Sequence, residues 1–509
     1  MKEECGVFGI FCRETEISRL IYFVLFALQH RGQESAGITV SDGFGLSSHK
    51  DIGLVNQVFQ SDYELSNLRG HIGIGHVRYS TTGSSKLSNA QPLIAVRQRD
   101  SKQMEIDFPR KGPYHNPDAV MALAHNGNLL NANKLRQRLE EKGYRFQTSS
   151  DSEAILYLIE YYARKSTRSS NIIEDAIAKC MKDIKGAYSL VIMTPEKLFA
   201  VRDPKGIRPL CLGYLPGTDS KSNGSTNDGY VVASETCALD IVGARYIREI
   251  EPGECCVIHL PDKPESIMFK SPKDKHNALC IFELIYFARP DSEFNGILIE
   301  EVRERLGKQL AKEYPIDADF VMPVPESGIT AASGYAEEHK SKCIRGLIKN
   351  RYVMRTFILP DQHLREVGIK LKLNPLKQKL KGKRIILIDD SIVRGTTSAK
   401  IVRMLREAGA KEIHMLISCP PIKYPCFYGI DTANRDDLIA SNKNEDEICE
   451  YIGADSLHFL SQEGLLEAVH PAINSTHDDG NKGYCTACFD GKYPVPIPGD
   501  MKMTKFDLE

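Results

Sequence analysis

Apolar residues follow two different patterns along the chain. Up to about residue 255, short apolar segments are separated by glycine-rich and polar turns, which is typical of antiparallel strands. Beyond residue 273, apolar strands alternate with amphipathic helical segments, the pattern of a parallel α/β sheet. We therefore predict an α+β domain over residues 5–255 and an α/β domain over residues 256–509, preceded by a removable leader of residues 1–4.

The same patterns place the individual elements. Apolar segments predict strands at 6–11, 36–40, 72–76, 190–194, 198–202 and 230–234 in the first domain, and at 320–324, 384–388 and 413–418 in the second. Helical periodicity predicts helices at 17–29, at 152–165 with Ser152 as a possible cap, and at 398–408. Residues 97–116 and 215–228 are polar and rich in turn formers, so we expect surface loops.

Composition narrows the class of protein. The chain has 509 residues, 42% of them hydrophobic and 26% charged, which suits two or three globular domains. Its net charge of -1 offers no basic field for nucleic acid or an anionic membrane. The longest apolar runs, such as 20–28, are too short to span a bilayer, and residues 1–5 lack the apolar core of a secretion signal. We expect a cytoplasmic protein with small-molecule partners.

The most informative segment is RIILIDDSIVRGTTS at residues 384–398. Residues 385–388 have no polar alternation, so they predict a strand buried on both faces that delivers Asp389 and Asp390 at its carboxyl end, where α/β sheets bind ligands. Gly395 allows close approach of an anion, and Thr396 and Thr397 add hydroxyl donors before the helix. The acids suit ribose hydroxyls and a Mg²⁺ shared with pyrophosphate. A strand followed by an acidic turn is the simpler alternative.

This segment resembles the phosphoribosyl pyrophosphate (PRPP) motif of type I phosphoribosyltransferases. The resemblance implies that the paired acids hold the ribose hydroxyls and that the following loop holds the 5-phosphate. It also implies a Mg²⁺ associated with both acids and with Ser327 in PVPESG, and a loop from Lys349 to about residue 379 that closes over PRPP, with Lys349 also touching nucleotide. The PRPP-binding residues are then Asp389, Asp390, Ser391, Arg394, Gly395, Thr396 and Thr397.

Cys5 is the candidate nucleophile of the first domain. Removal of residues 1–4 would expose its own amino group, which titrates near pH 8 and can act as base for the thiol. Cys5 alone would more simply be a buried strand cysteine. It is followed, however, by HRGQESAGI at 30–38, GHVRYSTTG at 75–83, AHNGNL at 124–129 and SSDSE at 149–153.

Together these motifs resemble the glutamine amidotransferase domain of the amino-terminal nucleophile (Ntn) class. The resemblance implies attack of Cys5 on the glutamine amide, with Asn126 and Gly127 as the oxyanion hole. Arg78 would bind the glutamine α-carboxylate and Asp151 its α-ammonium. We expect His30, His76 and His125 to be structural, because the amine does the work of the base.

The chain has fourteen cysteines, and Cys485 and Cys488 form a Cys-x-x-Cys pair. On its own the pair fits zinc, an iron–sulfur cluster or redox chemistry. Cys280 precedes IFELIYFARPDS and Cys426 lies in PPIKYPCFYGI, contexts that resemble the iron–sulfur type of glutamine PRPP amidotransferases. The resemblance implies one structural [4Fe–4S] cluster per subunit on these four cysteines. Cys255 and Cys256 are interpreted as core residues.

The resemblance covers the chain from EECGVFGI to ACFDGKYP. It implies an Ntn amidotransferase domain followed by a type I phosphoribosyltransferase domain, which transfer ammonia from glutamine to PRPP to give 5-phosphoribosylamine in the first committed step of purine synthesis. It also implies one Mg²⁺ per subunit, purine nucleotide inhibitors and a homo-oligomer, a tetramer in the family. Two alternatives remain open: a different ammonia acceptor, and a PRPP- or nucleotide-sensing regulatory module without turnover.

Overall fold

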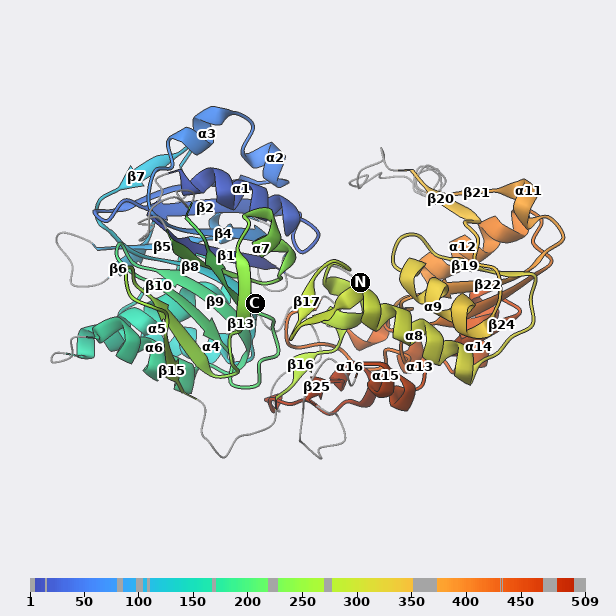
Figure 1. Ribbon diagram of the computed structural model, residues 1–509. Coiled ribbons are helices and arrows are strands. Elements are labelled where there is room, and N and C mark those ends of the chain that lie inside the picture. The colour runs from blue at the N-terminus through green and yellow to red at the C-terminus, as the bar shows by residue number, and fades with distance from the viewer. Residues whose placement is uncertain are drawn as a thin grey trace.

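The computed structural model describes residues 5–13, 16–79, 86–97, 104–107, 110–166, 171–217, 228–269, 277–350, 373–430, 432, 434–469 and 483–498. Figure 1 shows two parts side by side, the amino-terminal one in blue to green and the carboxyl-terminal one in yellow to red. Among the described residues, no helix has both the length and the apolar character needed to cross a membrane.

The amino-terminal part contains two antiparallel sheets. The first has the order β13 (Arg245–Glu249), β11 (Cys211–Leu215), β12 (Gly229–Ala233), β1 (Gly6–Phe11), β4 (Ile72–Arg78), β2 (Ser35–Ser41), β3 (Leu46–Ile52) and β7 (Tyr114–Asn116). The second has the order β15 (Glu265–Met268), β14 (Glu254–Ile258), β10 (Leu198–Arg202), β9 (Gly186–Met193), β8 (Ala119–Leu129), β5 (Leu93–Arg97) and β6 (Met104–Ile106).

Helices cover the outer faces of this two-sheet sandwich. Beside the first sheet lie α1 (Ile17–Ala27), α2 (Val55–Val58), α3 (Asp62–Ser66) and α7 (Cys237–Ile241). Beside the second lie α4 (Ala132–Glu140), α5 (Asp151–Lys165) and α6 (Ile172–Asp183). A 3-10 turn, η1, spans Leu87–Asn89. Phe8 and Ile10 of β1 pack under α1, whereas Val7 and Phe11 pack between the sheets. Because both faces of β1 are buried, the strand is apolar throughout.

The carboxyl-terminal part is built on a four-stranded parallel sheet. Its order is β19 (Phe320–Pro323), β22 (Arg384–Asp389), β23 (Glu412–Ile417) and β24 (Ser456–Phe459). The helices of this part are α8 (Ile299–Glu313), α9 (Ile329–His339), α11 (Lys377–Leu380), α12 (Thr396–Glu407), α13 (Ile439–Asn442), α14 (Glu445–Ile452), α15 (Gln462–Val469) and α16 (Ala487–Asp490), with a π-helical turn η2 (Glu283–Phe287) and a 3-10 turn η3 (Arg435–Asp437).

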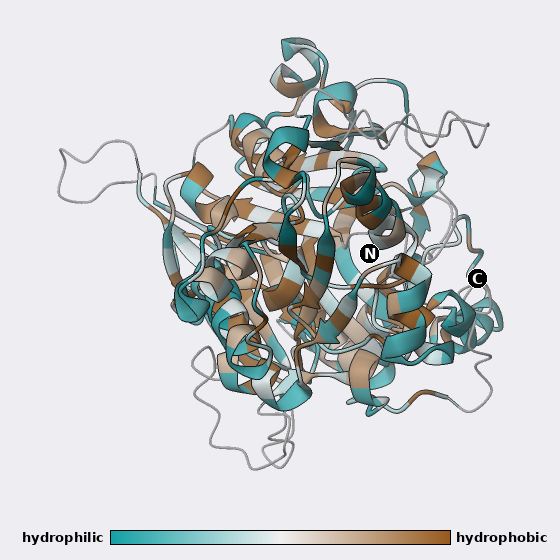
Figure 2. Ribbon diagram, turned by 90° about the vertical axis from the view of Figure 1, so that its right-hand side faces the viewer, coloured by the Kyte–Doolittle hydropathy of each residue, from teal (hydrophilic) through white to brown (hydrophobic). Residues whose placement is uncertain are grey.

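Three two-stranded pairs complete this part: β16 (Leu279–Cys280) with β25 (Tyr484–Cys485), β17 (Glu293–Phe294) with β18 (Ile297–Leu298), and β20 (Leu347–Lys349) with β21 (Leu373–Pro375). Pairing of β16 with β25 joins the start of this part to its end in sequence. Figure 2 shows apolar residues concentrated on the central strands and hydrophilic residues on the outer helices.

The predicted strands and fold classes agree with the structure, with four local corrections. The helix cap is Ser150 rather than Ser152, because the Ser150 hydroxyl accepts the Ser152 N–H at 3.3 Å. Thr396 and Thr397 form the first turn of α12 instead of preceding it. Residues 97–116 contain the edge strands β6 and β7, which a polar sequence did not reveal. Of the predicted loops, residues 98–103, 108–109, 218–227 and 351–372 lie outside the described residues.

The fourth correction concerns the domain boundary. The predicted division between Cys255 and Cys256 falls inside β14, which pairs with β10 and β15 in the second sheet. The adjacent apolar pair is core, as predicted, with Cys255 facing the helices and Cys256 facing the first sheet. We propose that the amino-terminal domain extends to the end of β15.

Candidate active sites and cysteine cluster

Cys5 lies immediately before β1, beside the end of β4. Its side chain is 7% exposed, and its sulfur donates to the carbonyl oxygen of Tyr79 at 3.3 Å. Burial raises the pKa of the Cys5 thiol to about 11, against the smaller lowering effects of the Tyr79 backbone and the Arg78 charge. A thiol with this pKa is protonated near neutral pH, so a neighbouring base is needed to make it a nucleophile.

Asn126 and Gly127, the predicted oxyanion-hole residues, lie near the end of β8. The Asn126 side chain is 1% exposed, and its amide nitrogen has no hydrogen-bond partner among the described residues. A buried donor without a partner is costly unless a ligand completes it. Gly127 has a φ of +145°, and a Cβ there would lie 2.0 Å from the Ala187 carbonyl oxygen, so no larger residue fits.

The backbone before Asn126 is held from both sides by buried side chains. The Gln91 side-chain oxygen accepts the His125 N–H at 2.7 Å, and His76 Nε2 contacts the His125 carbonyl oxygen at 3.1 Å. Burial lowers the pKa of His76 to about 3, so this ring is neutral at physiological pH and cannot act as a charged acid. We did not predict a role for Gln91 from the sequence. Its position in the Gln-Pro-Leu segment was the signal that could have indicated one.

Arg78 and Asp151 converge on the same site. Arg78 ends β4 and its guanidinium lies 3.8 Å from the Glu34 carboxylate, while Asp151 opens α5 and accepts the Leu129 N–H at 3.0 Å. Both side chains are buried, and both charges act on the Cys5 thiol. Burial raises the pKa of Asp151, but His125 and the Leu129 N–H outweigh it and leave the pKa below its usual value. The positive charge of Arg78 and the negative charges of Glu34 and Asp151 therefore all act on the thiol.

The second site lies at the carboxyl end of β22, as the sequence predicted. Asp389 and Asp390 are 8% and 6% exposed, and the Ser327 hydroxyl, from the turn after β19, donates to Asp389 at 2.9 Å. Ser391 donates to the Asp390 carboxylate. Burial and the adjacent Asp390 raise the pKa of Asp389 well above its usual value. Two buried carboxylates repel each other. A divalent cation bound by these carboxylates and the neighbouring hydroxyl would offset this repulsion.

The turn into α12 completes this site. Gly395 has a φ of +71°, which favours glycine, and the exposed Thr396 and Thr397 hydroxyls belong to the first turn of the helix. Arg394 is exposed and pairs with Asp437 at 2.7 Å. The free N–H groups at the start of a twelve-residue helix attract an anion, in keeping with the predicted phosphate position.

A cavity of about 520 Å³ lies between the two sites. Its lining includes His30 and Arg31 from the amino-terminal domain, and Ser327, Thr330 and Lys349 from the other. Arg31 also donates to the Cys5 carbonyl oxygen at 3.3 Å. One lining residue, Arg31, thus contacts the Cys5 backbone, and another, Ser327, contacts Asp389.

Cys280, Cys426, Cys485 and Cys488 are brought together from distant segments. Cys280 and Cys485 are direct partners in the pairing of β16 with β25. Burial raises the pKa of Cys488 well above its usual value, and the charges of Cys485, Cys280 and Cys426 add to the rise. None of the four forms a disulfide with another described residue. No group of three or more His, Cys, Asp or Glu side chains in the described part of the chain is close enough to share one metal ion.

Comparison with known proteins identifies the family. Residues 103–239 match the glutamine amidotransferase domain family and residues 295–445 match the phosphoribosyl transferase domain family. Proteins named amidophosphoribosyltransferase are 49% identical over 508 residues in Synechococcus elongatus, covering 100% of this chain and 94% of that protein, and 47% identical in Bacillus subtilis, covering 98% and 96%. The chain belongs to the amidophosphoribosyltransferase family. It is thus a glutamine-dependent pentosyltransferase of purine biosynthesis, as predicted from the sequence.

Solved structures of amidophosphoribosyltransferases agree with this assignment. The glutamine PRPP amidotransferase of B. subtilis in complex with ADP and GMP has a TM-score of 0.84 and 46% identity, covering 99% of this chain and 100% of that one. A structure described as the allosteric regulatory enzyme of purine biosynthesis gives the same TM-score and identity. The predicted order of an amidotransferase domain before a phosphoribosyltransferase domain is confirmed.

Proposed function

We propose that Cys5 and the Asp389–Asp390 pair are the two reaction centres, joined through the cavity between the domains. The Cys5 sulfur attacks the side-chain amide carbon of glutamine, the carbon–nitrogen bond breaks, and ammonia leaves. Water then hydrolyses the thioester to glutamate. The ammonia lone pair forms a bond with C1 of PRPP while the bond from C1 to pyrophosphate breaks, which gives 5-phosphoribosylamine.

The observation that carries this proposal is the cavity bounded by Arg31 on one side and Ser327 on the other. Ammonia released into bulk water is diluted and protonated, whereas a closed connection keeps it neutral and close to the acceptor. Neither of the alternatives left open by the sequence explains why a neighbour of the Cys5 backbone, Arg31, and a neighbour of Asp389, Ser327, line the same cavity. A different acceptor would not need the paired acids, and a sensor would not need the thiol.

We propose the following roles within the first centre. The amine freed by removal of residues 1–4 acts as base for Cys5, and the partnerless Asn126 amide, with the Gly127 N–H, receives the charge that develops on the glutamine carbonyl oxygen. Arg78 and Asp151 bind the α-carboxylate and α-ammonium, because both are buried, carry opposite charges and act on the thiol.

Asn126→Ala is expected to lower the kcat of glutamine-dependent synthesis by about 10²- to 10³-fold, because one donor to the oxyanion is lost. Rates with glutamine and with ammonium chloride as nitrogen source should be compared, since the ammonia-dependent rate does not use this donor. Asn131→Ala is the matched control, because its side-chain amide donates to the Asp183 carbonyl oxygen and accepts the Lys185 N–H. Equal losses with both nitrogen sources would contradict the assignment.

In the second centre, Asp389, Asp390 and Ser327 would hold Mg²⁺, one per subunit. When bound, the ion neutralises charge on the leaving pyrophosphate. The acids also accept hydrogen bonds from the ribose hydroxyls, while Gly395, Thr396, Thr397 and Ser391 surround the 5-phosphate, with Arg394 and Lys349 as nearby cations. The position of Lys349 beside the cavity suits contact with PRPP or with an inhibitory purine nucleotide. The predicted oligomer and the cytoplasmic location stay predictions.

We propose that the four clustered cysteines hold a structural [4Fe–4S] cluster, one per subunit. The charges of Cys485, Cys280 and Cys426 raise the pKa of Cys488, so these thiols lie near one another and fit a group that takes them as thiolates. Bound there, the cluster would tie residue 280 to the carboxyl-terminal segment. Purified protein should contain about four iron and four sulfide per chain, and Cys488→Ser should lose both and unfold at lower temperature. Cys343→Ser, which changes an exposed thiol, is the control. Stoichiometric zinc would contradict the cluster.

Reaction stoichiometry tests the proposed function. Purified protein with glutamine, PRPP and Mg²⁺ should release glutamate and pyrophosphate in equal amounts, and pyrophosphate release should stop when every nitrogen source is omitted. Glutamate without pyrophosphate would indicate another acceptor. Binding of PRPP with no turnover at all would indicate the regulatory alternative.

A further inference from the structure

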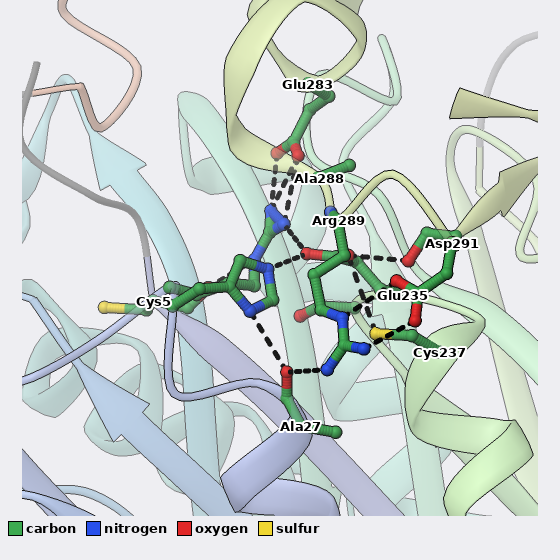
Figure 3. Close-up of polar contacts among 12 residues, drawn as sticks. Cys5, Ala27, Glu235, Cys237, Glu283, Ala288, Arg289 and Asp291 are labelled. Atoms are coloured by element: carbon green, nitrogen blue, oxygen red, sulfur yellow. Dashed lines mark hydrogen bonds and ion pairs between the residues drawn. The ribbon is translucent and has the colours of Figure 1, made fainter. Parts of the chain in front are cut away.

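Arg31 forms a buried charge network with Glu235 and Glu283, two acids that Figure 3 shows in the same region as Cys5 and Arg289. Its side chain is 1% exposed. The guanidinium contacts the Glu235 carboxylate at 2.5 Å and makes hydrogen bonds of 2.6 to 3.0 Å with both oxygens of Glu283, while its Nε donates to the Cys5 carbonyl oxygen at 3.3 Å. Two buried acids thus hold one buried cation against the backbone of the nucleophile.

The acids come from different parts of the chain. Glu235 belongs to the amino-terminal domain, whereas Glu283 opens the segment of residues 283–293, which we call the linker segment. Glu235 also accepts the Arg289 N–H at 2.8 Å and the Ser292 hydroxyl at 2.7 Å, so it holds the linker segment directly. Burial raises the pKa of Glu235, but His30 and Arg31 outweigh it and hold the pKa well below its usual value.

His30 strengthens the same contact. Its Nδ1 faces the Ala27 carbonyl oxygen at 3.0 Å, and its Nε2 faces the Glu235 carboxylate at 2.7 Å. Arg289 from the linker segment also donates to the Ala27 carbonyl oxygen, at 3.4 Å. The end of α1, the motif that contains Arg31, and the linker segment are therefore joined by one set of polar contacts.

The network forms part of the wall of the cavity between the sites. His30, Arg31 and residues 285–290 line it, and Ser327 and Lys349 lie on the phosphoribosyltransferase side. Glu283 also lies 3.8 Å from Arg208, whose guanidinium donates to the Tyr428 carbonyl oxygen at 3.0 Å, two residues after Cys426. A displacement of the linker segment would therefore also move the Cys5 backbone, because Glu283 holds Arg31 and Arg31 binds the Cys5 carbonyl oxygen.

We propose that Glu283 and Glu235 are positioning residues of the glutamine half-reaction, which hold Arg31 so that the linker segment sets the position of Cys5. This inference rests on the proposed role of Cys5 as nucleophile. If either carboxylate is lost, the buried Arg31 guanidinium has one counter-charge fewer. The guanidinium would then move away from the Cys5 carbonyl oxygen. A small displacement of a nucleophile costs about 10²-fold in rate.

The test compares nitrogen sources in Glu283→Gln, which keeps the size of the side chain and removes its charge. We expect kcat/KM with glutamine to fall by about 10- to 100-fold, while the rate with ammonium chloride stays within about twofold because the PRPP site is intact. Glu283→Asp should recover part of the loss. Glu313→Gln is the control, because that acid accepts only from Ser461 at 2.7 and 2.8 Å.

Ser292→Ala provides a milder second variant should Glu283→Gln fail to fold. It removes one donor to Glu235, and the glutamine-to-ammonia rate ratio should fall about threefold to tenfold. Parallel loss with both nitrogen sources, or an unchanged ratio, would overturn the positioning role. Cys5→Ala, assayed beside these variants, separates the two proposals: continued glutamine-dependent synthesis in that variant would refute Cys5 as nucleophile, whatever the ratio in Glu283→Gln.

Discussion

Cys5→Ala is expected to remove glutamine-dependent synthesis of 5-phosphoribosylamine, by on the order of 10⁴-fold or more, and to leave ammonia-dependent synthesis in place. The sulfur forms the covalent bond to the glutamine carbonyl carbon, and the methyl group of alanine cannot replace it. The second centre does not use the thiol and accepts ammonia from solution. Pyrophosphate release with glutamine, and separately with ammonium chloride, measures both effects in one preparation.

Cys180→Ala is the matched control for this experiment. Cys180 is another buried thiol of the amino-terminal domain, on α6, where it packs in the helical core. Its replacement should lower stability without changing the ratio of the two rates. If Cys5→Ala kept its glutamine-dependent rate, or lost both rates together, the thiol would not be the nucleophile.

Asp389→Asn is expected to abolish synthesis with either nitrogen source, by at least about 10²-fold, while glutamine hydrolysis survives in part. The substitution removes a charge from the pair that would hold the cation and the ribose hydroxyls. The asparagine amide would also replace the carboxylate oxygen that accepts the Ser327 hydroxyl. Pyrophosphate and glutamate should be measured separately, because only the first is expected to disappear.

Asp317→Asn is the control for the acidic pair. Its side chain is 93% exposed and pairs with Arg384 on the surface, so its loss should change the free energy of unfolding by at most about 1 kcal/mol and leave both products unchanged. Equal loss of glutamate and pyrophosphate in Asp389→Asn would indicate general unfolding. Retention of pyrophosphate release would place the PRPP site elsewhere.

Sequence patterns predicted the elements whose chemistry is local. The uninterrupted apolar run of residues 385–388 predicted β22, and the acids after it lie at the sheet edge as expected. Cys5, Asn126 and Asp151 were predicted because each lies in a short motif, and in the structure the Asp151 charge acts on the buried Cys5 thiol. Parallel and antiparallel strands also differ in their hydrophobic pattern, so both fold classes could be predicted.

Other features depend on contacts that no local pattern encodes. Glu235 and Glu283 are single acids in apolar surroundings, and their partner Arg31 is more than 200 positions away in the chain. The edge strands β6 and β7 have no apolar alternation, so their polar sequence suggested a loop. Cys255 and Cys256 gave no sign that the second sheet continues through them to β15.

The central claim, transfer of ammonia from Cys5 to PRPP through the cavity between the domains, is tested most directly with isotopes. Glutamine labelled with heavy nitrogen in its side-chain amide is supplied together with an excess of unlabelled ammonium chloride, and the 5-phosphoribosylamine is trapped and analysed by mass spectrometry. Internal transfer predicts a product that carries the heavy nitrogen almost completely. A product whose isotope content matches that of ammonia in the bulk solution would contradict the account.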